Sequence, residues 1–268
     1  MLSNFTTLAG SAYKVNTDGG PTLTPAWFAG RRILVMGLGL HGGGLSVARW
    51  LIARGAHVRL TDLKTAAALM PSVRQLPKSR RLSLALGHHR AADFHWAEVV
   101  VQNPAVPRES PWLSVARLSG ARIENEATLF FHLVGRQRII GVTGTRGKST
   151  TASLTAALVR RRFPDTVLAG NISTTPMFAV LDRVRNSRGP VVLELSSWQL
   201  ENLGAQRMSP RIAVVTNVLP DHRNRYRRHA SYVTAKWQIM AHQQPGDIAV
   251  LNADDPTTRA FGAACVLT

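Results

Sequence analysis

Two glycine-rich segments restrict the possible folds of this chain more than any other feature of its sequence. GLGLHGGG at residues 37–44 and GVTGTRGKSTT at residues 141–151 each follow an apolar, β-branched run and precede apolar residues at helical spacing. A strand that passes through glycines into a helix is typical of a βαβ unit, in which consecutive strands are parallel. The sequence therefore predicts an α/β protein with parallel sheets, built as two successive series.

Strand and helix patterns alternate after each glycine-rich segment. Short apolar runs bounded by turn residues predict strands, and apolar residues three or four apart predict helices. The predicted strands cover residues 31–39, 56–63, 82–89, 97–107, 138–144, 166–171, 190–197, 211–218 and 247–255. The predicted helices cover residues 45–55, 66–76, 110–118, 124–134, 147–162, 177–185 and 229–243. We expect Pro71 to break its helix and the last residues, AACVLT, to enter another strand.

Because the pattern restarts near Gly135, we expect two domains after a flexible lead-in at residues 1–29. Residues 30–135 are predicted to form a Rossmann-like domain, and residues 136–268 a central domain that resembles a P-loop NTPase. The chain is 45% hydrophobic and 18% charged, so it can bury a core and is not globally disordered.

The composition indicates the compartment and argues against a membrane protein. Cys265 is the only cysteine, so no intrachain disulfide can form, which suits a reducing cytosol. The first 30 residues lack the pattern of a signal peptide, and no apolar run approaches the roughly 20 residues of a membrane helix. We therefore expect a cytoplasmic monomer that does not insert into membranes.

The net charge of +18 raises nucleic-acid binding as an alternative. The arginines are spread along the whole chain and form only small clusters, KSRR at residues 78–81 and RNRYRR at residues 223–228. No basic arm or basic helix with interleaved aromatic residues stands out. Because net charge favours non-specific association, we expect no specific nucleic-acid partner, although phosphorylated small ligands would also be attracted.

The first glycine-rich segment has the features of a dinucleotide-binding site. Gly37, Gly39 and Gly42 have G-x-G-x-x-G spacing, and Asp62 stands at the end of the next predicted strand. Backbone amides can approach a diphosphate at the positive end of the helix, and the carboxylate can accept hydrogen bonds from a ribose or base. Together with Leu40 these residues predict a nucleotide-diphosphate site. A turn without ligand and an NAD-dependent enzyme are the alternatives.

The second segment predicts a phosphate-binding loop with unusual spacing. The standard loop reads G-x-x-x-x-G-K-[ST], and this one has an extra residue before its last glycine. Gly144 and Gly147 let N–H groups turn toward a phosphate, and Lys148 can bridge the β- and γ-phosphates. The hydroxyl of Ser149 or Thr150 can hold Mg²⁺. The alternative is a glycine-rich turn that binds nothing.

Six motifs in order resemble those of the Mur ligase family. They are GVTGTRGKST, GNI at 170–172, LELSSWQLE at 193–201, NVLPDHRNRY at 217–226, YVTAKWQI at 232–239 and LNADDP at 251–256. The segment at residues 37–62 is similar to the family's N-terminal domain, so the resemblance covers residues 30–268. The GKST and ELSSxQLE forms look most like the MurD type, which adds D-glutamate to UDP-N-acetylmuramoyl-L-alanine.

The resemblance implies an ATP-dependent amide ligase of peptidoglycan precursor synthesis, with Mg²⁺ as its metal. The carboxylate of UDP-N-acetylmuramoyl-L-alanine accepts the γ-phosphoryl group, and D-glutamate then displaces phosphate from the acyl phosphate. The resemblance implies that Asn103 contacts the UDP substrate and that Asn171 lies near the acyl phosphate or the substrate. The implied ATP-binding residues are Gly144, Thr145, Arg146, Gly147, Lys148, Ser149, Thr150 and, on the adenine side, Asn252.

The resemblance also implies a metal site made by Ser149, Glu194, His222 and Lys236. Lys236 is expected to carry CO₂ as a carbamate, which turns a cation into a carboxylate-like ligand. The implied catalytic residues are Lys148, Asn171, His222 and Lys236. From the residues alone, the alternatives are a strand-end carboxylate in water or in an ion pair for Glu194, a solvated or structural loop residue for His222 and a snorkelling surface lysine for Lys236.

The chain departs from the family pattern at several positions. Arg146 replaces the usual asparagine and either adds a phosphate contact or crowds the loop, Ser173 replaces a glycine, and Arg223 and Asn224 replace an apolar residue and an aspartate. Trp198 is expected in the core. The family has a third, C-terminal domain, and we expect the chain to be either a fragment of a longer protein or a truncated relative without it. We therefore expect substrate binding without completed ligation. Another Mur-type ligase, with a different amino acid, and a non-catalytic nucleotide-binding module are the alternatives.

Overall fold

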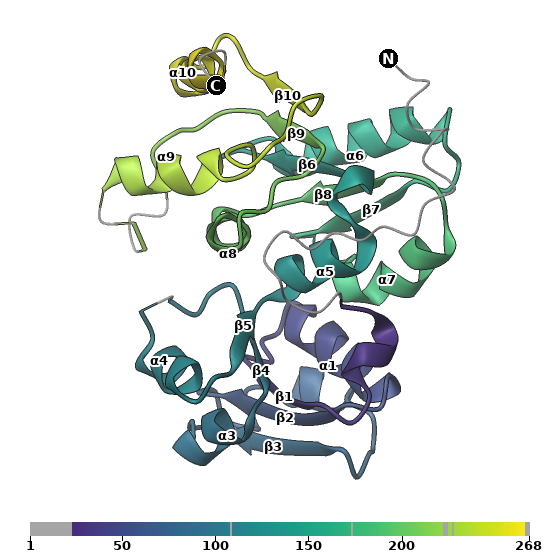
Figure 1. The fold of residues 1–268 in the computed structure, drawn as a ribbon, viewed down its shortest axis with the longest axis vertical. Helices are drawn as coiled ribbons and strands as arrows, with labels where there is room; N and C mark the ends of the chain where they lie inside the picture. The colour runs from purple at the N-terminus through teal and green to yellow at the C-terminus, as the bar shows by residue number, and fades with distance from the viewer. Residues whose placement is uncertain (1–22, 108, 173, 222–224, 227, 266–268) are drawn as a thin grey trace.

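Two parallel sheets lie one above the other in the computed structural model of the chain (Figure 1). The structure describes residues 23–107, 109–172, 174–221, 225–226 and 228–265. The lower sheet in Figure 1 contains strands from residues 32–124 and the upper sheet strands from residues 139–251. Every strand pair is parallel, which confirms the predicted α/β class. The domain boundary at residue 135 stays a prediction.

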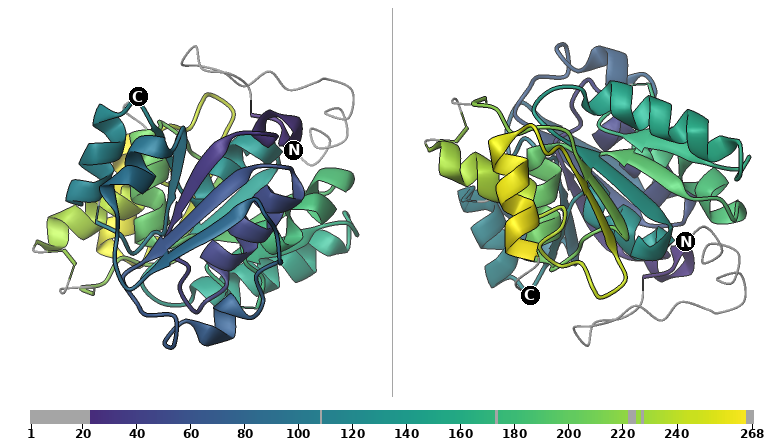
Figure 2. Two further views of the ribbon diagram at one scale, coloured as in Figure 1. Left: turned by 90° about the horizontal axis from the view of Figure 1, so that it is seen from below. Right: turned by 90° about the horizontal axis from the view of Figure 1, so that it is seen from above.

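The first sheet has the strand order β3-β2-β1-β4-β5, as in Rossmann folds. Its elements are η2 (Pro25–Phe28), β1 (Arg32–Met36), α1 (Gly43–Ala53), β2 (His57–Asp62), α2 (Met70–Val73), β3 (Leu82–Leu86), α3 (Ala91–Trp96), β4 (Val99–Gln102), α4 (Pro111–Leu118) and β5 (Arg122–Glu124). Alternate residues of β1 pack into two different apolar cores. Ile33 and Val35 pack into the first core, and Leu34 and Met36 pack into the second. Helices therefore cover both faces, which explains the continuous apolar run in the sequence (Figure 2).

The second sheet has the strand order β10-β9-β6-β8-β7. Its elements are β6 (Ile139–Thr143), α6 (Lys148–Arg160), β7 (Val167–Gly170), α7 (Met177–Asn186), β8 (Val191–Glu194), α8 (Ser197–Ala205), β9 (Ile212–Val215), α9 (His229–Trp237), β10 (Ile248–Leu251) and α10 (Pro256–Cys265). In each sheet the strand before the glycine-rich loop, β1 or β6, lies in the middle of the sheet. The chain adds strands first on one side of this strand and later on its other side, so the strand order reverses there. Such switch points are where open α/β sheets bind ligands.

Helices α1, α5 (Glu126–Val134) and α7 pack between the two sheets and join them through one apolar core (Figure 1). The Trp50 ring of α1 meets Phe28 at 5.3 Å and Phe178 of α7 at 5.4 Å between ring centroids. Its Nε1 also donates to Asp182 Oδ1 at 3.0 Å. Apolar packing and a hydrogen bond therefore connect the halves of the chain.

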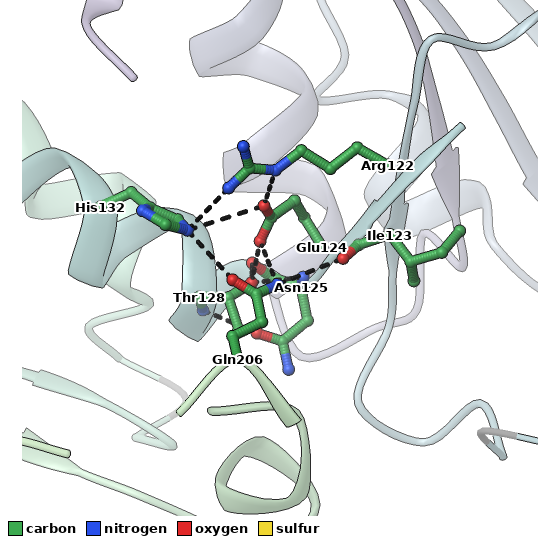
Figure 3. Close-up of polar contacts among 7 residues, drawn as sticks. All are labelled: Arg122, Ile123, Glu124, Asn125, Thr128, His132 and Gln206. Carbon is green, nitrogen blue, oxygen red and sulfur yellow. Dashed lines mark hydrogen bonds and ion pairs between the residues drawn. The ribbon is translucent and has the colours of Figure 1, made fainter. Parts of the chain in front are cut away.

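Helix α8 provides a second, polar connection between the sheets. Asn202 Oδ1 accepts a hydrogen bond from Gln102 of β4 at 2.6 Å. At the end of α8, Gln206 Nε2 donates to the fully buried carboxylate of Glu124 at 2.9 Å. Figure 3 shows that carboxylate in a polar cluster with Arg122, Thr128, His132 and Gln206. These side chains give the Glu124 carboxylate hydrogen-bond and ion-pair partners, which a buried charge requires.

Five elements differ from the sequence-based expectation. The prediction missed α3, β5 and α8, although Ser196 and Gln199 form a capping box at the start of α8. Pro71 does not break a helix but lies in the first turn of α2, where its missing N–H is not needed. The residues AAC continue helix α10 instead of entering a strand. The last three residues of the chain lie outside the described part.

Candidate functional site

The loop between β6 and α6 depends on two glycines. A Cβ at Gly144, where φ is +157°, would lie 1.9 Å from Thr216 Oγ1, so no larger residue fits. Gly147 has a φ of +78° and precedes the first residue of α6, Lys148. The Lys148 ammonium donates to the Thr145 carbonyl at 2.8 Å. The lysine therefore stands at a helix N-terminus, where backbone N–H groups and the dipole favour anions.

The same loop is fixed to the segment that follows β9. Arg146 N donates to Asn217 Oδ1 at 3.0 Å, and Thr216 Oγ1 donates to the Arg146 carbonyl at 2.7 Å. Thr145 Oγ1 accepts from Leu219 N at 2.9 Å. Thr216 and Asn217 were not predicted as site residues from the sequence. Their position directly after the strand that borders β6 is the signal that could have found them.

Glu194, at the end of β8, receives hydrogen bonds from both sides. Its Oε2 accepts from Ser149 Oγ at 2.6 Å and its Oε1 from Asn171 Nδ2 at 3.2 Å. The residue is 2% exposed. Gly170 makes this approach possible, because a Cβ there would lie 2.2 Å from the Glu194 carbonyl oxygen. The structure therefore brings together three of the predicted site residues around oxygen atoms of the kind that Mg²⁺ prefers.

Lys236 is buried, with 1% of its surface exposed, and does not snorkel. Its Nζ donates to the Gly144 carbonyl at 2.7 Å and lies 3.4 Å from Thr143 Oγ1. The Tyr232 ring lies 4.8 Å from the same nitrogen. Helix α9 thus places an amine against the back of the β6–α6 loop.

The environment of Lys236 favours a neutral amine. Its pKa falls from 10.5 to about 7, first because of burial and second because of the Lys148 cation, while Asp221 and Glu194 oppose the change. In a large fraction of the molecules, the Lys236 amine is therefore unprotonated at neutral pH. A neutral amine is the form that can act as a nucleophile.

The loop between β1 and α1 is held by the carboxylate of Asp62. Its Oδ2 accepts from the N–H groups of Leu38 at 2.9 Å and Gly39 at 3.2 Å, and its Oδ1 accepts from Lys64 N at 2.9 Å. Asp62 is 9% exposed. The Asp62 carboxylate therefore fixes the backbone of the β1–α1 loop through hydrogen bonds to its N–H groups.

Several glycines of the first loop allow close approach. A Cβ at Gly37 would lie 2.7 Å from Asn103 Cβ, and one at Gly44 would lie 2.3 Å from the Gly37 carbonyl oxygen. Gly44 therefore provides the close contact between helix and strand, whereas Gly42, with a φ of +85°, precedes the first residue of α1. Leu40 is 48% exposed. The loop presents its backbone at the carboxyl end of β1, as predicted for a diphosphate site.

One cleft of about 620 Å³ joins the two loops. The residues that line it are His41, Gly43, Asn103, Pro104, Ala105, Glu126, Thr145, Lys148, Gly170, Asn171, Ile172, Pro176, Ser196, Ser197, Trp198, Gln199, Asp221 and Lys236. The residues up to Glu126 come from the first half of the chain, and those from Thr145 onward come from the second. A ligand that fills the cleft would touch both halves.

Some predicted site residues lie away from this cleft. Asn252 follows β10 and donates to the Thr216 carbonyl at 2.9 Å, so it lies beyond the β6–α6 loop. Thr150 is exposed on α6. His222, Ser173, Arg223 and Asn224 lie outside the described residues. Within the described ranges no group of three or more His, Cys, Asp or Glu could hold a metal ion.

Glu126 is a cleft residue that was not predicted from the sequence. It is 7% exposed, and Phe178 N donates to its Oε1 at 3.4 Å. Burial raises its pKa from 4.5 to about 7, against hydrogen bonds from the N–H groups of Phe178 and Met177. No sequence signal marked it, because a glutamate in the first turn of a helix is ordinary.

Trp198 is not a pure core residue. It packs against the core, but it also lines the cleft between the loops and a second cleft of about 1130 Å³ along α8 and α9. The Arg225 guanidinium lies 4.9 Å from the centre of its ring. The expectation of a core tryptophan is therefore only half correct.

Comparison with protein families matches two regions of the chain. Residues 31–124 match the N-terminal domain of MurD-like Mur ligases, and residues 142–265 match the Mur ligase middle domain. The first region contains the first sheet, and the second region contains the second sheet apart from residues 139–141 of β6. Among the described residues, no helix combines the length and the apolar composition that crossing a membrane requires.

Curated relatives extend the comparison to the sequence level. The chain is 49% identical over 233 residues to the UDP-N-acetylmuramoylalanine--D-glutamate ligase of Roseiflexus sp. (strain RS-1). The aligned region covers 87% of the chain and 49% of that relative. The chain is 38% identical over 242 residues to the ligase of the same name from Treponema pallidum (strain Nichols), covering 86% and 45%. The chain thus spans about half the length of the curated relatives it matches.

Solved structures share the fold. The UDP-N-acetylmuramate:L-alanyl-gamma-D-glutamyl-meso-diaminopimelate ligase from Neisseria meningitides superimposes with a TM-score of 0.58 at 18% identity, covering 88% of the chain and 75% of that structure. The murein peptide ligase from Psychrobacter arcticus 273-4 gives a TM-score of 0.53 at 17% identity, covering 88% and 52%. At these identities the likeness concerns the fold alone.

Proposed function

Because the chain belongs to the Mur ligase family, we propose that its protein adds D-glutamate to UDP-N-acetylmuramoyl-L-alanine in peptidoglycan precursor synthesis. The reaction consumes ATP, requires Mg²⁺ and forms an amide through an acyl phosphate. Support comes from relatives up to 49% identical whose names state this activity. Residues 30–135 bind the UDP substrate in this proposal, and residues 136–268 bind ATP. The monomeric state and the cytoplasmic location stay predictions.

The β6–α6 loop binds the phosphates of ATP in this proposal. The N–H groups of residues 144–147 and of the first turn of α6 provide donors, and Lys148 exchanges its hydrogen bond to Thr145 for phosphate oxygens. The carbonyl of Arg146 is held by the 216–219 segment, which leaves the guanidinium for a further phosphate contact. Asn252, beyond that segment, is assigned to the adenine side.

Mg²⁺ fits the oxygen atoms beside this loop. Ser149 Oγ and the Glu194 carboxylate already share a hydrogen bond of 2.6 Å, which a hard cation would replace with two oxygen ligands. When bound, Mg²⁺ neutralises the charge between two anionic reactants. His222 and the carbamate of Lys236 are assigned to the same site from the family resemblance. Asn171, hydrogen-bonded to Glu194, is assigned to the substrate carboxylate.

Lys236 forms the carbamate by ordinary amine chemistry. The unprotonated Nζ attacks the carbon of CO₂, a C–N bond forms, and one proton leaves to solvent. Its pKa of about 7 keeps the nucleophilic form populated at neutral pH. The carbamate removes a buried cation beside Lys148, so the modification also relieves repulsion between two ammonium groups.

The first loop binds the UDP part of the substrate. The N–H groups of Gly42 and Gly43, which Asp62 does not bind, belong to the N-terminus of α1, where a diphosphate is favoured. Gly37, Gly39 and Leu40 shape the loop, and Asn103 borders it in the cleft. Asp62 supports the bound nucleotide by fixing the loop, in addition to the predicted contact with a ribose or base.

The observation that carries the proposal is the single cleft that both glycine-rich loops line. Calorimetric titrations test it with four probes: UDP-N-acetylmuramoyl-L-alanine, MgATP, NADH and a DNA duplex. We expect the first two to bind. Lys148→Ala should weaken MgATP at least tenfold and leave the UDP substrate unchanged, because it removes one phosphate contact. Lys78→Ala, at an exposed lysine of the first half, is the matched control.

Other outcomes would select the alternatives. NADH binding without MgATP binding would favour a dehydrogenase, and tight DNA binding at 150 mM salt would favour a nucleic-acid partner. If both ligands bind but phosphate release follows an amino acid other than D-glutamate, the protein is another Mur-type ligase. Binding of nucleotide without phosphate release from any amino acid would favour a non-catalytic module.

A further inference from the structure

The Glu126 carboxyl group lies in the cleft and has no role in the proposed reaction. It borders the same space as Gly43 and Asn103 of the first half and Pro176 of the second. It also borders a cavity of about 20 Å³ that Gly37 and Asn103 help to line, which is room for about one water molecule. The carboxyl group therefore lies beside the loop that is proposed to hold a diphosphate.

Its own helix does not need this side chain. The start of α5 is capped by Asn125 and Thr128, because Asn125 Oδ1 accepts from Thr128 N at 2.8 Å and Thr128 Oγ1 accepts from Asn125 N at 2.9 Å. The capping box satisfies the first turn without Glu126. The glutamate is therefore not explained by helix capping within α5.

Two other helix starts surround the carboxyl group. Oε1 accepts from Phe178 N, in the first turn of α7, over a long 3.4 Å. Oε2 faces the first residue of α1, since a Cβ on Gly43 would lie 3.0 Å from it. The glycine at this position lets the carboxyl group approach the backbone of the first turn of α1. That turn is where the first loop offers its N–H groups.

No cation compensates Glu126 within the described residues. The titratable residues that line the same cleft are His41, Lys148, Asp221 and Lys236, and the charged residues on α1, α5 and α7 are Arg49, His132, Asp182, Arg183 and Arg185. None of these forms an ion pair or a hydrogen bond with it, and the Asp182 carboxylate pairs with Arg54 instead. A buried carboxylate without a cation favours its neutral form, and the pKa of Glu126 is accordingly about 7.

We propose that Glu126 binds the ligand of the first loop in its protonated form, and that its carboxyl O–H donates a hydrogen bond to a phosphate oxygen at the start of α1. This inference rests on the proposed function, which places a uridine diphosphate group there. An ionised carboxylate at this position would repel the diphosphate, whereas the acid form adds a donor to the N–H groups of the loop. Binding of the ligand therefore takes up a proton above pH 7.

The experiment uses UDP-N-acetylglucosamine as the probe, because its diphosphate has no group that titrates between pH 6 and 8.5. Calorimetry at pH 8 in two buffers of different ionisation enthalpy gives the number of protons taken up. We expect close to one proton for the unmodified chain, and a Kd that rises about 16-fold in all between pH 7 and 8.5. Glu126→Gln keeps a donor that cannot ionise, so it should take up no proton and bind at least tenfold more tightly at pH 8.5.

Two further variants keep the test specific. His41→Asn removes the histidine that lines the same cleft, and it should leave the proton uptake unchanged. Glu98→Gln removes a half-buried carboxylate at the opposite end of the first sheet, where Arg31 pairs with it, and should behave like the unmodified chain. Uptake that persists in Glu126→Gln, or that disappears in His41→Asn, would overturn the inference.

The failure of this inference can be separated from that of the proposed function. A chain that does not bind UDP-N-acetylglucosamine at any pH contradicts the nucleotide site itself, and the inference falls with it. A chain that binds the probe without proton uptake contradicts only the role of Glu126. MgATP titration of Glu126→Gln checks that the variant is folded, because the β6–α6 loop does not contact residue 126.

Discussion

The burial of Glu126 predicts how the stability of the protein depends on pH, even without a ligand. Its pKa is 4.5 when exposed and about 7 in the folded chain, a difference of about 2.5 units. At about 1.4 kcal/mol per unit, this corresponds to ~3 kcal/mol. The folded state holds the proton more tightly, so this stabilisation is complete below pH 4.5 and is lost as the pH rises through 7. Glu126→Gln cannot ionise and should escape that loss.

Urea unfolding, followed by tryptophan fluorescence at pH 5, 6, 7 and 8, measures this difference. We expect the variant to gain stability relative to the unmodified chain as the pH rises, by up to ~3 kcal/mol between pH 5 and 8. Other titrating groups are common to both proteins and cancel in the comparison. A difference in unfolding free energy that stays constant from pH 5 to pH 8 would show that the carboxyl group is solvated, and would refute the reasoning.

Three further predictions concern the second loop and the connection between the sheets. In ¹³CO₂, Lys236 should give a carbamate carbon resonance that grows as the pH rises through about 7 and is absent in Lys236→Met. Gly144→Ala places a methyl group 1.9 Å from Thr216 Oγ1 and should weaken MgATP binding at least tenfold in calorimetry, with partial recovery in the double variant with Thr216→Ala. Gln206→Leu leaves the buried Glu124 carboxylate with one partner fewer and should lower the unfolding free energy in urea by ~1–3 kcal/mol.

Matched controls exist for each of these variants. Lys64→Met changes an exposed lysine, Gly262→Ala adds a methyl group at an ordinary distance of 3.4 Å from Leu251, and Gln75→Leu changes an exposed glutamine. A carbamate signal that survives in Lys236→Met, undiminished MgATP binding in Gly144→Ala, or unchanged stability in Gln206→Leu would each contradict the corresponding contact.

The sequence was sufficient for those parts of the fold that local chemistry determines. Both strand–glycine–helix turns, and most strands around them, follow from apolar runs that end at glycine. Helix α8 was missed because its apolar spacing is weak, although Ser196 and Gln199 gave a capping signal. Pro71 was misread because proline is compatible with the first turn of a helix and incompatible only with its interior.

The candidate site was less predictable, because burial depends on residues far apart in the chain. Local reasoning makes Lys236 a surface lysine, and only the family resemblance singled it out, whereas the structure buries it against the Gly144 carbonyl. Asp62 shows the opposite case: spacing assigned it to a ligand, and the structure shows its oxygens bound to the N–H groups of its own loop. Glu126 had no signal at all, since its surroundings come from α1 and α7.

The apolar contacts of α1, α5 and α7 have a consequence for how the protein can be divided. Trp50 on α1 and Phe178 on α7 come from different halves of the chain and pack ring against ring, and the buried Glu124 receives a hydrogen bond from Gln206 of the other half. Cutting the chain between the two glycine-rich series would expose both surfaces to water at once. Each piece would expose an apolar patch, and the first piece would also lose the Gln206 hydrogen bond to its buried Glu124 carboxylate, so the recognisable evolutionary modules are not independent units of solubility.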